Sequence, residues 1–93
     1  MRKYEFMTIF PTEENQFKTG LVQVKQVLSE YGVEIEKEEP FGDRELCYEI
    51  KKQRRGRFTL LVIAANPAKI SEIDKRLKLN ADILKYMFVR IDT

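Results

Sequence analysis

The sequence predicts an α+β domain in which a strand, a helix, two strands, a second helix and a last strand follow in that order. Alternating apolar and polar side chains, typical of strands with one buried face, recur in several stretches of the chain. Apolar residues at spacings of three and four, typical of amphipathic helices, occupy two stretches between them. With 93 residues and 43% hydrophobic content, the chain is expected to form a single domain, residues 1–93, around one core.

The first strand is predicted over residues 2–10 and the first helix over residues 13–31, with Thr12 as its N-cap. The aromatic residues of the strand share one parity and should face the core: Tyr4, Phe6 and Phe10. Apolar residues of the helix recur at spacings of 4, 3, 4 and 3 and should form its buried face: Phe17, Leu21, Val24, Leu28 and Tyr31. Gly32 is expected to end the helix.

A hairpin with a cationic tip is predicted after this helix. Residues 33–38 open the second strand, which residues 40–42 interrupt as a bulge or loop. The hairpin proper covers residues 44–64, and its second strand resumes at Phe58. We expect Gly56 to supply the positive φ that the connection requires.

A second helix and a last strand complete the fold. Ile70, Ile73 and Leu77 lie at spacings of 3 and 4 in the helix predicted over residues 68–79. Alternation over residues 84–91 predicts the last strand. Elements in this order form the ferredoxin-like, or split βαβ, fold (βαββαβ). Right-handed crossovers in that fold place both helices on one face of a four-stranded antiparallel sheet.

The residue inventory argues against catalysis, metal binding and a bound cofactor. The chain has one cysteine, Cys47, and no histidine, so the usual zinc sites and histidine-based acid–base chemistry are absent. No Gly-rich phosphate loop of known spacing occurs. No apolar run approaches the ~20 residues of a membrane span, and no signal-like apolar core follows the N-terminus. We therefore expect a cytoplasmic protein that is not an enzyme.

The parity opposite the aromatic one predicts an interaction surface. It carries seven apolar residues: Met7, Ile9, Phe58, Leu60, Val62, Met87 and Val89. A two-layer fold leaves this face of the sheet uncovered, and a contiguous exposed apolar patch usually marks an interface. Only one of the seven is aromatic, so a protein partner fits this face better than stacked RNA bases. The alternative is that a bulge shifts the parity and returns some of them to the core.

Positive charge is concentrated in the hairpin tip. The net charge of the chain is only +2, yet most residues from 51 to 57 are basic: Lys51, Lys52, Arg54, Arg55 and Arg57. Such a cluster predicts an arm that contacts RNA phosphates. The alternative is a loop that is basic only because it is solvated.

Residues 42–58 also carry the pattern of a known family, bacterial small ribosomal subunit protein six, which they resemble. The positions that match its signature are Gly42, Arg44, Glu45, Leu46, Tyr48, Ile50 and Lys51. The first five residues resemble the start of that family, and Gly56 and Phe58 match its second hairpin strand. Two positions depart from it, because Cys47 replaces a small residue and Glu49 stands where many members have proline.

The resemblance implies a structural, non-enzymatic role in translation. Members of that family bind small-subunit (16S) ribosomal RNA as heterodimers with small-subunit protein eighteen. By matched position, the resemblance implies four further RNA contacts: Arg2, Lys3, Lys85 and Arg90. The chain is therefore expected to be a structural protein of the small ribosomal subunit.

The same fold also supports other functions. A ligand-sensing domain would need a Gly-rich loop between the first strand and helix, and an acylphosphatase-like hydrolase would need an arginine in such a loop. Residues 11–14 supply neither feature. A homodimeric scaffold that pairs two sheets through the apolar face is a further alternative. A tight homodimer at low concentration in size-exclusion chromatography would favour it.

Overall fold

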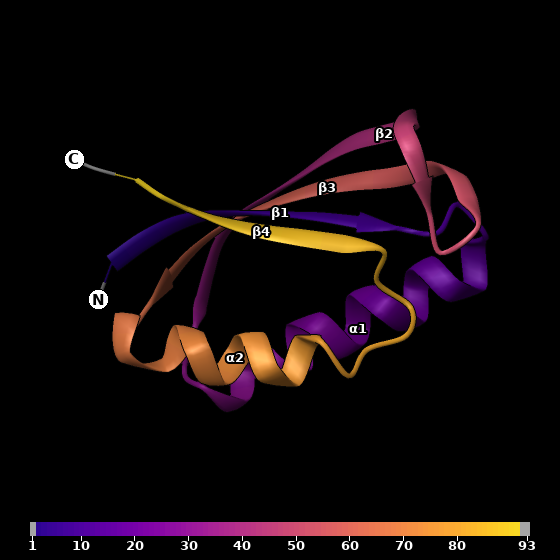
Figure 1. The fold of residues 1–93 in the computed structure, drawn as a ribbon. Coiled ribbons are helices and arrows are strands. Elements are labelled where there is room, and N and C mark those ends of the chain that lie inside the picture. The colour runs from indigo at the N-terminus through magenta and orange to yellow at the C-terminus, as the bar shows by residue number, and fades with distance from the viewer. Residues whose placement is uncertain (1, 92–93) are drawn as a thin grey trace.

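The computed structural model describes residues 2–91 and has two layers, a sheet and two helices packed on one of its faces (Figure 1). The elements are β1 (Arg2–Phe10), α1 (Glu14–Glu30), β2 (Glu34–Ile50), β3 (Gln53–Ala65), the 3-10 helix η1 (Pro67–Lys69), α2 (Ile70–Leu77) and β4 (Lys85–Arg90). The predicted ferredoxin-like order is thereby confirmed. None of the helices within residues 2–91 has the length and apolar character needed to cross a bilayer.

Neighbouring strands of the sheet are antiparallel and lie in the order β2-β3-β1-β4. Phe6 of the central strand β1 lies opposite Leu61 of β3 and Phe88 of β4. Its ring is fully buried and stacks on Phe88 with the two ring centroids 4.3 Å apart. Tyr4 and Phe10 are buried on the same face. The aromatic parity therefore faces the helices and forms the core, as predicted.

The helices cover the sheet with the faces that the apolar spacing predicts. Four of the predicted side chains are fully buried: Val24, Leu28, Ile73 and Leu77. Gly20 is buried in α1, where an added Cβ would lie 2.7 Å from the Asp82 carbonyl oxygen and 2.9 Å from the Phe10 ring. Close contact between α1 and its neighbours explains this mid-helix glycine. Gly32 has φ +70° just after α1, as a glycine that ends a helix does.

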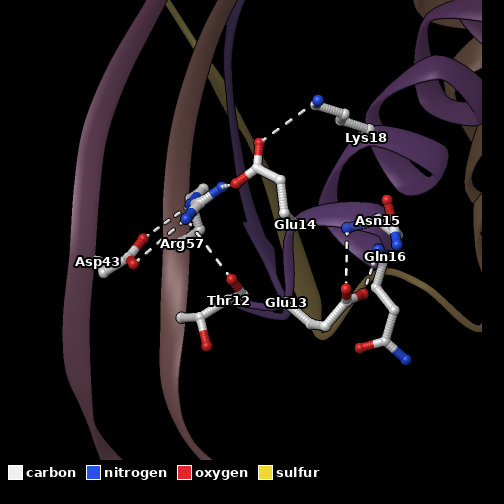
Figure 2. A network of polar contacts seen from close by, with 8 residues as sticks. All are labelled: Thr12, Glu13, Glu14, Asn15, Gln16, Lys18, Asp43 and Arg57. Atoms are coloured by element: carbon white, nitrogen blue, oxygen red, sulfur yellow. Dashed lines mark hydrogen bonds and ion pairs between the residues drawn. The ribbon is translucent and has the colours of Figure 1, made fainter.

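The first turn of α1 differs from the prediction. Glu13, not Thr12, is the N-cap, and its carboxylate accepts hydrogen bonds from the backbone N–H groups of Asn15 (3.1 Å) and Gln16 (2.7 Å) (Figure 2). A carboxylate at this position also interacts favourably with the positive end of the helix dipole. Thr12 instead offers its carbonyl oxygen to another partner, Arg57.

The hairpin turn also differs from the prediction. Ile50 pairs with Gln53, so the two-residue turn consists of Lys51 and Lys52, with φ 48° and 66°. Positive φ at both central residues is the requirement of a type I′ turn. Gly56 lies within β3 and is buried, and a Cβ there would collide with the Ile9 side chain. Gly56 is therefore needed for packing, and the expectation that it makes the turn is wrong.

β2 is a single strand of 17 residues rather than two. Register shifts relative to β3 occur between Ile35 and Lys37 and between Pro40 and Gly42, which confirms a bulge at the predicted interruption. Gly42 has φ +82° at this bulge. Irregularities of this kind increase local twist, and Figure 1 shows the far end of the β2–β3 hairpin curling away from the plane of the sheet.

Candidate nucleic-acid interface

The tip of the β2–β3 hairpin lies against the start of β4, although two strands separate β2 from β4 in the sheet. The Lys51 ammonium donates a hydrogen bond of 3.0 Å to the Ile83 carbonyl oxygen. The Lys85 ammonium donates one of 3.1 Å to the Tyr48 hydroxyl and lies 5.7 Å from the centre of that ring. The hairpin extends beyond Phe10, where β1 ends, and so reaches across to β4. Lys51 and Lys85 thus lie in one region.

The basic residues among residues 2–91 fall into two classes, those that form an ion pair with a carboxylate and those that do not. Ion pairs hold eight of them: Lys3, Lys18, Lys25, Lys37, Arg57, Lys69, Arg76 and Lys78. Within residues 2–91, five exposed basic residues without an ion pair lie at the hairpin tip and the start of β4: Lys51, Lys52, Arg54, Arg55 and Lys85. We name these five the tip cluster. Arg2, Arg44 and Lys75 also lack a carboxylate partner among the described residues but lie elsewhere.

Three other predicted RNA contacts, Arg2, Lys3 and Arg90, lie at the other end of the sheet. β1 runs from Arg2 to Phe10, a span of about 25 Å, and the hairpin tip lies beyond Phe10. Lys3 is at the opposite end, where it pairs with Glu36 at 3.3 Å. Arg90 of β4 lies opposite Tyr4, is exposed and already has an interaction partner. Eight of the nine predicted cations therefore form two groups rather than one surface, one at the hairpin tip and one at the Lys3 end of the sheet.

Arg57 belongs to neither group, because it is held in a network between the hairpin and α1 (Figure 2). Its Nε and Nη2 atoms donate to the two Asp43 carboxylate oxygens at 2.8 and 3.4 Å. Its Nη1 donates to Glu14 at 2.9 Å, and Nη2 also donates to the Thr12 carbonyl oxygen at 3.5 Å. The guanidinium lies 4.7 Å from the centre of the Phe17 ring. Only 22% of the side chain is exposed, so its placement differs from that of a phosphate-contacting arm.

The network shifts the ionisation of both main partners. The hydrogen bond from Arg57 holds the pKa of the Asp43 carboxyl below its usual range, and the charges of Arg57 and Arg55 act in the same direction. The hydrogen bonds to Asp43 and then Glu14 raise the pKa of Arg57. Both groups are therefore charged at neutral pH, and the positive charge of Arg57 is balanced within the protein.

The predicted protein-partner face is only partly accessible. Met87 and Val89, on the edge strand β4, are 51% and 49% exposed. Leu60 is only 8% exposed, so this central residue of the face is already covered within the chain. The other four members are half-buried: Met7, Ile9, Phe58 and Val62. The most accessible part of the face is therefore the β4 edge.

Tyr48 is the contact that the sequence reading missed. Its side chain is exposed, yet its hydroxyl and ring both contact Lys85 from a strand that is not a neighbour in the sheet. The available signal in the sequence was an aromatic residue close to a basic run. Among residues 2–91, no cluster of cysteine, aspartate and glutamate side chains has the arrangement of a metal site.

The chain is similar in sequence to ribosomal proteins of one family. Residues 3–90 match the family model described as Ribosomal protein S6. The chain is 52% identical to small ribosomal subunit protein bS6 of Treponema denticola, over 99% of both chains. It is 41% identical to the protein of the same name from Treponema pallidum (strain Nichols), over the full length of both.

Solved structures give the same result for the fold. The crystal structure of 30S ribosomal protein S6 from Thermotoga maritima superposes with a TM-score of 0.85 and 26% identity, covering 97% of this chain and 87% of that one. The C-terminal domain of the MgtC protein from Mycobacterium tuberculosis superposes with a TM-score of 0.67 at 12% identity, covering 98% of this chain and 88% of that one. The second likeness concerns the fold alone.

Proposed function

Because the chain belongs to the ribosomal protein S6 family of the small ribosomal subunit, we propose that it binds 16S ribosomal RNA together with small-subunit protein eighteen. Its relatives are structural ribosomal proteins, and the protein is not an enzyme. A structural protein of the bacterial ribosome would work in the cytoplasm. The proposal thus comprises contacts with 16S ribosomal RNA, a heterodimer with protein eighteen and a cytoplasmic location.

The observation that carries the RNA proposal is the tip cluster. A chain with a net charge of +2 gathers five exposed cations without carboxylate partners in one region of residues 2–91. Cations placed together repel one another, so folding stability gives no reason for this arrangement. An RNA backbone supplies the missing anions, and such contacts set position and affinity rather than sequence choice.

The turn supports the same proposal. Lys51 and Lys52 both have positive φ, a conformation in which side chains other than glycine and asparagine are disfavoured. An Asn-Gly pair would fit this turn with less strain. Two lysines in this turn are therefore less favourable for folding than Asn-Gly, but they place two exposed basic side chains at the end of the hairpin.

The test compares two double variants in a complex reconstituted with protein eighteen and a fragment of 16S RNA. Arg54→Ala with Arg55→Ala should weaken RNA binding and lower the slope of log affinity against log salt by roughly 1.4 to 1.8, for two phosphate contacts. Lys18→Ala with Lys69→Ala removes the same charge from paired residues on the helices and should leave both quantities unchanged. Equal binding of both variants would refute the role of the tip cluster.

We propose that the partner protein covers the β4 edge of the apolar face. Met87 and Val89 are half-exposed apolar side chains on an edge strand, where a second protein can bury them. Met87→Asp should weaken heterodimer formation in isothermal titration while leaving the melting temperature of the isolated chain nearly unchanged. Unchanged affinity for the partner, or a tight homodimer in size-exclusion chromatography, would contradict this assignment.

A further inference from the structure

An open pocket of about 390 Å³ lies where the hairpin tip meets the end of α2 and the start of β4. Lys51 comes from the tip, Lys78 from the end of α2, and Lys85 from β4. Asp74 is the one acidic residue that lines the pocket among the described residues, so three lysines stand against one aspartate in the lining. Lys51 is far in sequence from Lys78 and Lys85, and the contact of the hairpin tip with the start of β4 brings it to them.

The charges of Lys51 and Lys85 are not neutralised within residues 2–91. Lys51 donates to a backbone carbonyl oxygen at 3.0 Å, and Lys85 donates to a phenol oxygen at 3.1 Å. Both acceptors are neutral, and an ammonium group has three donors, so each lysine keeps donors for a ligand. The two hydrogen bonds hold the ammonium groups beside neutral acceptors without cancelling their charge.

The carboxylate of Asp74 is already occupied. It accepts a hydrogen bond of 2.6 Å from the Tyr86 hydroxyl and pairs with Lys78 at 3.2 Å. The Tyr86 hydrogen bond and then Lys78 hold the pKa of the Asp74 carboxyl below its usual range. Its negative charge is thus balanced by Lys78, which leaves Lys51 and Lys85 as the uncompensated charges of the pocket.

We propose that this pocket binds a single phosphate group between Lys51 and Lys85. Ammonium groups bind phosphate oxygens as strong charge-assisted donors, and the volume is ample for a phosphate with part of the group that carries it. The phosphate comes either from an RNA backbone or from free phosphate or a nucleotide. The RNA source rests on the proposed function, whereas the pocket itself does not.

The primary test uses inorganic phosphate and the full chain. Backbone amide shifts of Ile83 and Lys85 should change saturably in an NMR titration with phosphate, but not with chloride at equal ionic strength. Lys51→Gln and Lys85→Gln should each weaken phosphate binding by about tenfold. Lys52→Gln is the matched control, because Lys52 is adjacent in the turn and does not line the pocket, and it should change binding less than about twofold.

Two results would overturn the proposal. One is a linear, non-saturating response to phosphate in the wild-type chain. The other is an equal loss of binding in Lys51→Gln and Lys52→Gln, which would indicate attraction by the whole charged tip rather than a pocket. Using two lysines from different elements guards against a variant that merely loosens the hairpin.

A second arm identifies the source of the phosphate. If it belongs to RNA, Lys51→Gln should weaken binding of the 16S fragment more than Lys52→Gln does, and inorganic phosphate should compete. If it is free phosphate or a nucleotide, the two variants should bind RNA equally while only Lys51→Gln loses phosphate. Saturable phosphate binding by a chain that does not bind the RNA fragment would refute the proposed function and leave the pocket standing.

Discussion

Arg57 joins the β2–β3 hairpin, at the level of Asp43, to the start of α1, and Arg57→Ala should therefore destabilise the fold. The side chain joins Asp43 of β2 to Glu14 of α1 and lies over the Phe17 ring at 4.7 Å. Partly exposed ion pairs contribute little each, a cation–π contact adds about 0.5–1 kcal/mol, and the covered stem adds packing. We expect the free energy of unfolding to fall by about 2 kcal/mol.

The assay is thermal unfolding followed by circular dichroism. A loss of about 2 kcal/mol corresponds to a melting temperature lower by roughly 8–16 °C in a domain of this size. Arg57→Lys, the control, keeps the charge but cannot donate to both Asp43 oxygens and Glu14 together, so it should lie between wild type and Arg57→Ala. A melting temperature of Arg57→Ala within about 2 °C of wild type would refute the reasoning.

The same network predicts how stability depends on acid. The hydrogen bond from Arg57 lowers the pKa of Asp43 in the folded chain below its ordinary value of 3.8. The ionised Asp43 therefore contributes fully to folding stability at pH values above 3.8. The contribution is lost as the pH falls through the lower, folded-state pKa. Urea unfolding between pH 5 and pH 2 should therefore show a steeper decline for wild type than for Asp43→Asn. Parallel curves would show that Asp43 is not coupled to folding.

Three further predictions concern individual positions in the sheet and the turn. Thr59→Val should raise the free energy of unfolding by about 1 kcal/mol, because the buried Thr59 hydroxyl has no hydrogen-bond partner among the described residues. Thr8→Val should lower the free energy of unfolding by a similar amount, because it removes the 2.8 Å hydrogen bond from the Thr8 hydroxyl to the Thr59 carbonyl oxygen. Urea unfolding measures both changes. Lys51→Asn with Lys52→Gly should raise the melting temperature and weaken RNA binding, and unchanged RNA affinity would count against the tip cluster. Gly56→Ala should lower the free energy of unfolding by about 1–3 kcal/mol, measured by urea unfolding, since its Cβ would collide with an isoleucine of β1.

The layers of the fold were predictable because each depends on a local period. The parity of Tyr4, Phe6 and Phe10 identified the buried face of β1, and spacings of three and four identified the buried stripes of both helices. A strand with one buried face shows a period of two residues, and a helix with one buried face shows a period of 3.6, whatever the tertiary arrangement around them. Element bounds moved by a few residues, as with α1, which begins at Glu14.

The residues of the hairpin turn were mispredicted because a glycine can serve two structural purposes, and the sequence does not show which one applies. Gly56 can supply positive φ or leave space for a neighbour, and the second use depends on how sharply the hairpin curls over β1. Lysines carry no turn signal, so nothing local marked Lys51 and Lys52 as left-handed residues. The bulge at Gly42, which was predicted, contributes to the curl but does not fix its direction.

The basic residues from 51 to 57 of the hairpin form one run in the sequence, but in the structure they belong to two different environments. Arg57 faces α1 because alternation along β3 places it on the helix side, where Glu14 lies 43 residues away in the chain. Lys85, which was assigned to a separate group, joins the tip instead. Which cations remain available to a ligand thus depends on where the carboxylates lie in the folded chain. That arrangement, rather than the number of basic residues, favours the tip cluster over the other end of the sheet, where Glu36 already balances the charge of Lys3.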